Sequence, residues 1–504
     1  MPGPHGPFSC ARSRALIRAL AIAVAVVVAG AGLGSVLAVA PATAASSPNP
    51  TLAWRSCGGG FRCATLRVPL DEARPDGKQL GIAVIRRPAR DAADRIGTLV
   101  VNPGGPGVSG VDFLRAQADS FPAAMQDAFD LVAFDPRGVG GSGPVDCVDS
   151  LDPLFAQQFS PTSPERRDAL VDAYRDVAAG CAARSGGLLA HVSTLETAHD
   201  LDRLRAALGE DHLDYLGYSY GTYLGALYAR EFPDRVGRIV LDGPVDPSLD
   251  GAAGTLSQAR GFERGLDAFF TWCAGDESCM FREYGAPAAA YDALRARLVA
   301  DPVPAEDQPG RSLGQTRFDA AVLQLLYGGR SQWRPLDRGL TATEDGNSSP
   351  LLELADAYEG RDDSGRDDGA LESFWAIACR DGPAIGDVAA AAALEAEVAR
   401  VAPRLGPFIV NNSLACSVWP QPALPPTGPI AAAGTPPILV VGTTRDPATP
   451  YSQARALARQ LEAGVLLTVA GRGHTSFGTG NECADRVVVR FLRTGEPPPA
   501  GTRC

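Results

Sequence analysis

Short apolar runs alternate with segments of helical periodicity in the first half of the chain. Runs of four to six mostly apolar residues predict strands that are buried on both faces, and they lie at 96–101, 129–134, 213–216 and 238–241. Ser193 and Glu196 form a capping box that opens a helix, and Gly209 closes this helix just before the third run. Strands that alternate with helices predict a parallel sheet with helices on both faces.

The alternation has an antiparallel start and one long interruption. Runs at 63–70 and 80–86 flank an Asp-Gly turn and predict two antiparallel strands. From about 250 to 425 the pattern is mostly helical, as at 259–272 and 288–298, which predicts an inserted cap. Apolar runs then return at 437–442 and 465–469, and the helices predicted after them cover 451–461 and 484–492.

The N-terminus has the pattern of an export signal. Arginines in the first 18 residues precede an uncharged run at 19–40, and Pro41-Ala42-Thr43-Ala44 resembles a cleavage site. An uncleaved anchor is the alternative, because 22 apolar residues can span a bilayer. We expect cleavage, a secreted protein in the extracellular space or the cell wall, and no stable membrane insertion afterwards. The predicted domains are a signal (1–44), the first part of an α/β core (45–249), a helical cap (250–425) and the second part of the core (426–504).

The charge and the cysteines restrict the partners and the chemistry. The net charge of −12 becomes −15 once residues 1–44 are removed, since they contain three arginines and no acids. Such an acidic protein is not expected to bind nucleic acid. Ten cysteines lie beyond the signal, and export makes disulfides the default state. The chain has no C-x-x-C pair and only His474 lies near a C-terminal cysteine, so zinc is not expected. We also expect no other metal and no cofactor.

Sequence alone does not fix the disulfide pairing. The ten cysteines lie in local segments that core elements separate, which favours pairs between neighbours in the sequence. The expected pairs are Cys57–Cys63, Cys147–Cys181, Cys273–Cys279, Cys379–Cys416 and Cys483–Cys504.

A serine lies at a sharp transition from strand to helix. Ser219 is the centre of Gly-Tyr-Ser-Tyr-Gly at 217–221, between the apolar run at 213–216 and a helical segment at 222–232. In a nucleophile elbow this arrangement exposes the serine hydroxyl at the C-terminal end of a strand. Upstream, the strand at 96–101 runs into a Gly/Pro loop at 102–107, whose backbone N–H groups suit an oxyanion hole. An ordinary turn is the alternative for that loop.

An acid and a base follow the serine in the order typical of α/β-hydrolases. His474 follows the last apolar run in a Gly-flanked loop, and Asp446 follows the run before it. In such a triad the serine attacks, the histidine transfers the proton and the aspartate fixes the imidazole tautomer. Asp242 also follows a core strand and is the rival acid, but Asp446 is favoured because its strand adjoins that of His474. The sequence therefore predicts an α/β-hydrolase fold with a mostly parallel sheet and a large helical cap.

Several motifs together resemble a known family. The Pro-Gly-Gly-Pro-Gly loop at 103–107 is similar to the H-G-G-P-G loop of proline-iminopeptidase-like hydrolases, with proline in place of histidine. Asp-Pro-Arg-Gly at 135–138 resembles their D-x-R-G loop, whose arginine is expected to pair with a nearby carboxylate or carbonyl. The segments at 217–221, 445–450 and 471–474 look like the secreted tripeptidyl aminopeptidases. The resemblance implies that Gly105 and Tyr220 donate the oxyanion N–H groups.

The resemblance also implies an exopeptidase that cleaves peptides near free N-termini and releases tripeptides. The substrate ammonium then needs a carboxylate partner, and Glu372 and Asp381 are candidates beside the aromatic Phe374-Trp375 segment of the cap. A secreted carboxylesterase with the same triad is the alternative, because ester cleavage needs no amine recognition. A non-catalytic binding protein of the same fold is a third reading, against which the complete triad argues.

Overall fold

The computed structural model describes residues 51–362, 364–382 and 385–504. The predicted export signal lies outside the described residues. Within these ranges, no helix is both long and apolar enough to cross a membrane.

Among the described residues, nine strands form one sheet in the order β1-β2-β3-β5-β4-β6-β7-β10-β11. The pairs from β1 to β5 are antiparallel and the remaining pairs are parallel. The strands are β1 (Arg55–Ser56), β2 (Arg62–Pro69), β3 (Gln79–Arg87), β4 (Gly97–Asn102), β5 (Phe129–Phe134), β6 (Leu213–Tyr218), β7 (Val236–Asp242), β10 (Ile438–Arg445) and β11 (Gly464–Arg472). A separate hairpin pairs β8 (Val303–Pro304) with β9 (Ser312–Leu313).

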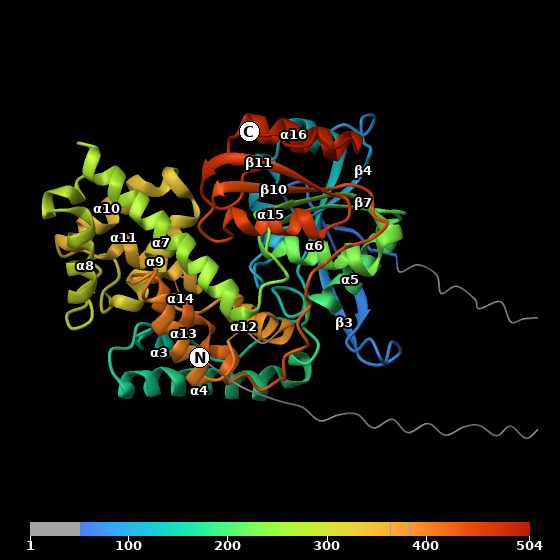
Figure 1. Cartoon of the computed structure of the whole chain (residues 1–504). Helices are drawn as coiled ribbons and strands as arrows, with labels where there is room; N and C mark the ends of the chain where they lie inside the picture. Colours follow the sequence, from blue (N-terminus) through green and yellow to red (C-terminus); the bar gives the residue numbers. More distant parts are fainter. Residues whose placement is uncertain (1–50, 363, 383–384) are drawn as a thin grey trace, which may run out of the picture. The chain divides into compact units, whose positions relative to one another are not determined.

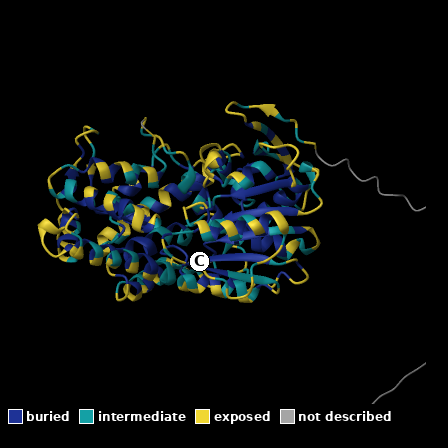
Figure 2. Ribbon diagram, turned by 90° about the horizontal axis from the view of Figure 1, so that it is seen from above, coloured by how far each residue is buried: buried dark blue, intermediate teal, exposed yellow. Residues whose placement is uncertain are grey.

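Helices cover both faces of the sheet. On one face α5 (Thr194–Leu208), α6 (Tyr220–Glu231) and α15 (Tyr451–Gln460) bury their apolar sides against the strands. On the other face lie α1 (Gly110–Gln117), α2 (Ala123–Ala128) and α16 (Glu482–Thr494). Figure 2 shows the strands as a dark blue buried layer, while the outer faces of the helices are exposed. The predicted α/β-hydrolase architecture is confirmed.

A group of helices lies beside the sheet (Figure 1). It consists of α7 (Gly251–Gly275), α8 (Pro287–Arg297), α9 (Gln315–Tyr327), α10 (Trp333–Glu344), α11 (Ser349–Glu359), α12 (Ala370–Asp381), α13 (Val388–Val398) and α14 (Gly406–Asn412). Helices α3 (Asp152–Phe155) and α4 (Pro164–Leu189) join it, because their apolar residues belong to the same buried cluster. The sequence interpretation had assigned this 26-residue helix α4 to no element. The helical layer is therefore assembled from two separate parts of the chain.

The core strands are close to their predicted positions. The run at 129–134 coincides with β5, while β10 and β11 each continue three residues beyond the predicted ends. The predicted capping box is present at the start of α5: the Ser193 side chain accepts from the Glu196 N–H, and Glu196 accepts from the Ser193 N–H. Gly209 closes α5 in the left-handed conformation at φ 80°.

The chain end lies along the outermost strand. The N–H of Cys504 donates to the carbonyl of Thr468 in β11 at 2.8 Å, and the N–H of Thr468 donates to the carbonyl of Thr502 at 3.2 Å. A disulfide joins Cys504 to Cys483 at the start of α16. The structure contains four further disulfides: Cys57–Cys63, Cys147–Cys181, Cys273–Cys279 and Cys379–Cys416.

Candidate active site

Ser219 lies in the turn between β6 and α6 with a strained backbone. Its φ of 53° and ψ of −123° are unusual for a residue with a side chain, as in a nucleophile elbow. The flanking glycines are required by close packing. A Cβ on Gly217 would lie 2.4 Å from the carbonyl oxygen of Gly221, and one on Gly221 would lie 2.7 Å from Oδ1 of Asn102. The Gly-x-Ser-x-Gly pattern is therefore a steric requirement of this turn.

Two backbone N–H groups near the serine have no hydrogen-bond partner among the described residues. Tyr220 is the first residue of α6, so its N–H has no partner within the helix. Gly105 lines the same cleft as Ser219 and Tyr220, and among the described residues its N–H makes no hydrogen bond. The neighbouring N–H of Gly104 is instead occupied by Oδ1 of Asn102 at 3.0 Å. Gly105 and Tyr220 thus leave their donors available to an anion beside Ser219.

His474 and Asp446 are in direct contact. Nδ1 of His474 lies 2.9 Å from Oδ2 and 3.0 Å from Oδ1 of Asp446. The N–H groups of Ala448 and Thr449 donate to Oδ1 of Asp446, both at 2.9 Å, and hold the carboxylate in place. Burial opposes a charged imidazole, but the charges of Asp446 and Asp242 outweigh it and raise the pKa of His474 above its ordinary value.

Ser219 and His474 line one hollow of about 260 Å³ but are not hydrogen-bonded to each other. Nε2 of His474 is buried and has no partner among the described residues. A hydrogen bond between a nucleophile and its base is often long in an unliganded enzyme and tightens in the substrate complex. The free Nε2 is therefore the atom that can accept the serine proton.

Asp242, the rival acid, has a different contact. Its Oδ2 accepts the N–H groups of Ser476 and Phe477 at 2.9 and 2.8 Å, just after the His474 turn. Complete burial raises the pKa of Asp242 to about 6. Nδ1 of His474 faces Asp446 and not this carboxylate, so Asp242 holds the loop that carries the histidine.

A cleft of about 760 Å³ extends from the other side of Ser219. Its walls come from the Gly/Pro loop, from α1 and from helices α9, α11, α12 and α14. Among the described residues that line it, only Asp112 and Asp368 are charged. Loss of solvent around the carboxyl group and the nearby charge of Asp112 raise the pKa of Asp368. The cleft therefore favours a cationic ligand.

Glu372 and Asp381 do not line this cleft. Glu372 accepts the N–H groups of Cys147 and Val148 at 3.1 and 3.0 Å, and burial raises its pKa to about 7. Asp381 accepts the N–H and the hydroxyl of Thr194, and its pKa is likewise raised to about 7 by loss of solvent. Both carboxylates hold the helix α12 segment to the core, which corrects their predicted role as partners of a substrate amine.

Two polar groups to which the sequence assigned no contact, Thr449 and Asp135, support the site. The Thr449 hydroxyl lies 3.2 Å from Oδ2 of Asp446 and 3.4 Å from Nδ1 of His474. Asp135 accepts the Ser109 hydroxyl at 2.7 Å and so ties the start of α1 to the end of β5. The predicted brace of Arg137 is present, since its buried guanidinium makes two 2.8 Å hydrogen bonds with Asp200.

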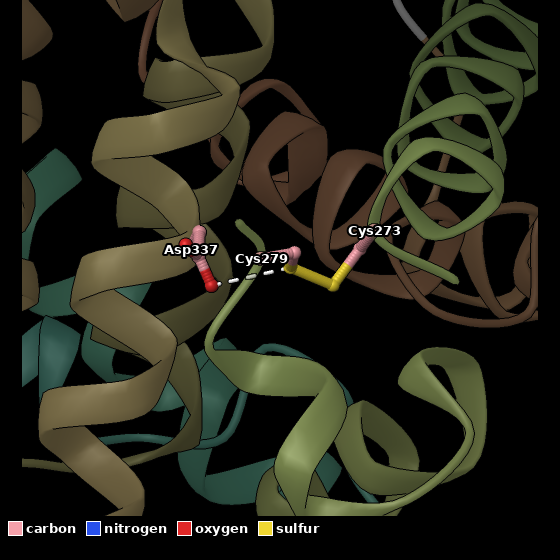
Figure 3. A group of neighbouring side chains, drawn as sticks. All are labelled: Cys273, Cys279 and Asp337. Atoms are coloured by element: carbon pink, nitrogen blue, oxygen red, sulfur yellow. Dashed lines mark hydrogen bonds between the residues drawn. A yellow bond between two sulfur atoms is a disulfide. The ribbon is translucent and has the colours of Figure 1, made fainter. Parts of the chain in front are cut away.

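One group in the described chain has the composition of a metal site but not its chemistry. Cys273, Cys279 and Asp337 lie close together (Figure 3). The two cysteines are joined in a disulfide and offer no thiolate, which is the form that binds metal. Asp337 accepts the N–H of Phe281 at 2.8 Å, so its carboxylate is already used to hold the backbone at this position.

Comparison with known proteins gives one family model and several full-length relatives. A model described as TAP-like protein matches residues 402–504. The serine protease Hip1 of Mycobacterium tuberculosis is 38% identical over 459 residues, which covers 88% of each chain. Carboxylesterase B of the same organism is 36% identical over 482 residues, or 90% of each chain. The tripeptidyl aminopeptidase of Streptomyces lividans is 32% identical over 467 residues, covering 90% of this chain and 86% of that protein.

Proposed function

Because the chain belongs to the TAP-like family of α/β-hydrolases and is a serine hydrolase of the peptidase type, we propose that it is an exported exopeptidase. In this proposal Ser219, His474 and Asp446 release tripeptides from the free N-termini of peptides. The observation that carries it is the cleft, which joins the serine to two carboxylates and to no basic group among its described lining residues.

The geometry of the site supports the following sequence of steps. Nε2 of His474 takes the proton from the Ser219 hydroxyl as the oxygen attacks the scissile carbonyl carbon. The N–H groups of Gly105 and Tyr220 stabilise the oxyanion, and the imidazolium then protonates the leaving amine. Water enters on the same path, with His474 as base, and hydrolyses the acyl-enzyme to regenerate Ser219. Asp446 holds Nδ1 protonated throughout.

The cleft and the smaller hollow on either side of Ser219 suggest where the two halves of the substrate bind. The larger cleft has the size of small-ligand pockets, which are about 300–1,000 Å³, and would hold the acyl part of the substrate. The smaller hollow, on the His474 side of Ser219, would receive the leaving peptide. An ammonium inside the larger cleft needs an opposite charge, because an unpaired buried charge is costly. Asp112 and Asp368 are the charged groups available to it.

The proposal is tested with a tripeptide amide reporter and its N-acetylated twin. Acetylation removes the positive charge and adds bulk where the cleft should end. We expect at least a ~100-fold lower kcat/KM for the acetylated substrate, which corresponds to about 2.7 kcal/mol. Equal cleavage of the two would reject the exopeptidase reading.

Charge-neutral variants sharpen the test. Asp112→Asn and Asp368→Asn should raise KM for the free tripeptide amide by about tenfold or more each, since each removes a charge-assisted contact. The control is Asp211→Asn, an exposed residue at the opposite end of β6. The acetylated substrate should respond little to any of the three changes.

Carboxylesterase activity is the second candidate, because a relative that is 36% identical has the name Carboxylesterase B. An esterase would cleave a simple acyl ester faster than the matched tripeptide amide. Its kcat/KM would also be unchanged by Asp112→Asn and Asp368→Asn. The ratio of amide to ester turnover in the same preparation therefore separates the two functions.

A further inference from the structure

A second groove, distinct from the cleft, lies on the far side of the Asp446 loop. It has a volume of about 910 Å³ and shares no lining residue with the cleft or with the smaller hollow. Four arginines line it: Arg264, Arg330, Arg445 and Arg472. The remaining walls include Trp272 and Trp333.

Main-chain packing brings the four arginines together. Arg445 and Arg472 are register partners at the ends of the adjacent strands β10 and β11. Arg330 lies in a short helix, η4 (Gly329–Gln332), whose Gly329 packs so closely on the Arg472 carbonyl that an added Cβ would lie 2.6 Å from it. Arg264 lies on α7, three residues after a glycine that packs on the main chain of the Asp446 loop.

These guanidinium groups have no protein anion to neutralise them. Within the described chain, none of the four has a carboxylate oxygen within 4.0 Å or donates a side-chain hydrogen bond. The two acids at the groove are already engaged: Asp446 with His474, and Asp267 with Arg404 at 3.5 Å. Loss of solvent and the charges of Arg445 and Arg330 lower the pKa of Arg472.

Contact with aromatic rings stabilises these positive charges only in part. The guanidinium carbons of Arg330 and Arg472 both lie 5.8 Å from the centre of the Trp333 ring. A cation over an aromatic face is weakly stabilised at an exposed site, and here two cations share one ring. All four arginines are exposed, so a ligand can reach them from solvent. A concentration of unpaired positive charge in a chain of net charge −12 needs an explanation.

We propose that this arginine groove is a binding site for an oligoanion that presents several phosphate groups. Arginine forms paired hydrogen bonds with phosphate and carboxylate oxygens. A single carboxylate would satisfy one of the four guanidinium groups, whereas a chain of phosphates places successive charges along the groove. The Trp272 and Trp333 side chains then flank the bound chain.

The test measures the binding of inorganic tripolyphosphate to the full protein by calorimetry at fixed ionic strength. The test variant is Arg264→Gln/Arg330→Gln, because both residues lie outside the loops that carry Asp446 and His474. The control is Arg486→Gln/Arg490→Gln, which removes the same charge from exposed positions on α16. We expect the test variant to bind at least about tenfold more weakly than the wild type and the control, with a shallower dependence on salt.

Equal affinity of all three proteins for tripolyphosphate would overturn the proposal, as would a lack of binding to the wild type at millimolar concentration. A second arm uses vesicles that contain phosphatidylglycerol. Vesicle binding that depends on Arg264 and Arg330 without tripolyphosphate binding would also overturn it, and would assign the surface to lipid headgroups. Unchanged turnover of a peptide substrate by the test variant shows that the variant is folded.

Discussion

The contact between Asp446 and His474 gives the sharpest quantitative prediction. In Asp446→Asn the oxygen that accepts the N–H groups of Ala448 and Thr449 is retained, while an NH2 group replaces the oxygen that lies 2.9 Å from Nδ1 of His474. The NH2 group can only donate toward Nδ1, while the retained oxygen, 3.0 Å from Nδ1, already accepts the two backbone N–H groups. The substitution therefore weakens the preference for the tautomer with the proton on Nδ1, and the tautomer with the proton on Nε2 cannot accept a proton from Ser219.

The magnitude follows from the lost charge. Two unit charges about 4 Å apart attract by about 4 kcal/mol at an effective dielectric constant of 20, and this attraction stabilises the imidazolium in the transition state. Since each 1.36 kcal/mol is a factor of ten in rate, kcat should fall by about 10³ from the charge alone. The wrong tautomer adds to this loss, so we expect a total of about 10³–10⁴.

The assay compares kcat for a tripeptide amide reporter across pH, with thermal unfolding as the check on folding. Asp242→Asn is the matched control, since it removes a buried carboxylate that also faces the His474 loop. Its kcat on the plateau should stay within about tenfold of wild type. Near-wild-type activity of Asp446→Asn, combined with a 10³-fold loss in Asp242→Asn, would refute the assignment of the acid.

The pH dependence of activity gives a prediction with a definite direction. As the proposed base, His474 must be neutral, so we expect activity to be lost as the pH falls through the pKa of His474, which lies above the ordinary 6.5. The charge of Asp242 contributes to that upward shift. In Asp242→Asn the acid limb of kcat/KM should therefore move to lower pH.

Two further predictions concern stability. Gly221→Ala places a Cβ 2.7 Å from Oδ1 of Asn102, so we expect the free energy of unfolding, measured in urea, to fall by about 1–3 kcal/mol. The control is Gly254→Ala, whose Cβ would meet no atom within 4 Å and which should leave the stability unchanged or raise it. The buried Glu372 has a folded-state pKa of about 7 against an ordinary 4.5, so its stabilising effect is complete below about pH 4.5 and is lost as the pH rises through 7. Glu372→Gln should abolish that part of the decline, about 3 kcal/mol at most, and parallel declines in both proteins would contradict this.

The core was predictable because its signals are local. The apolar run before Ser219 and the glycines around it specify strand, turn and helix within ten residues, and β5 needs only its own six residues, of which all but Asp130 are apolar. Helix α4 was harder to predict, because it contains Gly180, Gly186 and Gly187, and glycine disfavours a helix. Gly180 is needed because an added Cβ would lie 2.2 Å from the carbonyl oxygen of Cys147, a tertiary contact that the pattern does not reveal.

Side-chain roles in the cap were not predictable for a related reason. Glu372 and Asp381 were interpreted as ligands because they flank aromatic residues, yet their partners are backbone groups 225 and 187 residues away. The cleft acids come from separate elements, Asp112 from α1 and Asp368 from the loop before α12, and no spacing in the sequence joins them. The arginine groove likewise combines α7, η4 and the ends of two strands.

The chain end has a consequence for association between molecules. An outermost strand offers a row of unpaired backbone groups on which a second molecule can build its own sheet. In this protein the backbone groups of Thr502 and Cys504 pair with the N–H and carbonyl of Thr468 in β11. The disulfide between Cys504 and Cys483 holds the chain end at this position. Proteolytic trimming of these few residues would leave the Asp446 and His474 loops intact but would free the N–H and carbonyl of Thr468 at the edge of the sheet. We expect such a trimmed protein to associate edge to edge more readily than the intact chain.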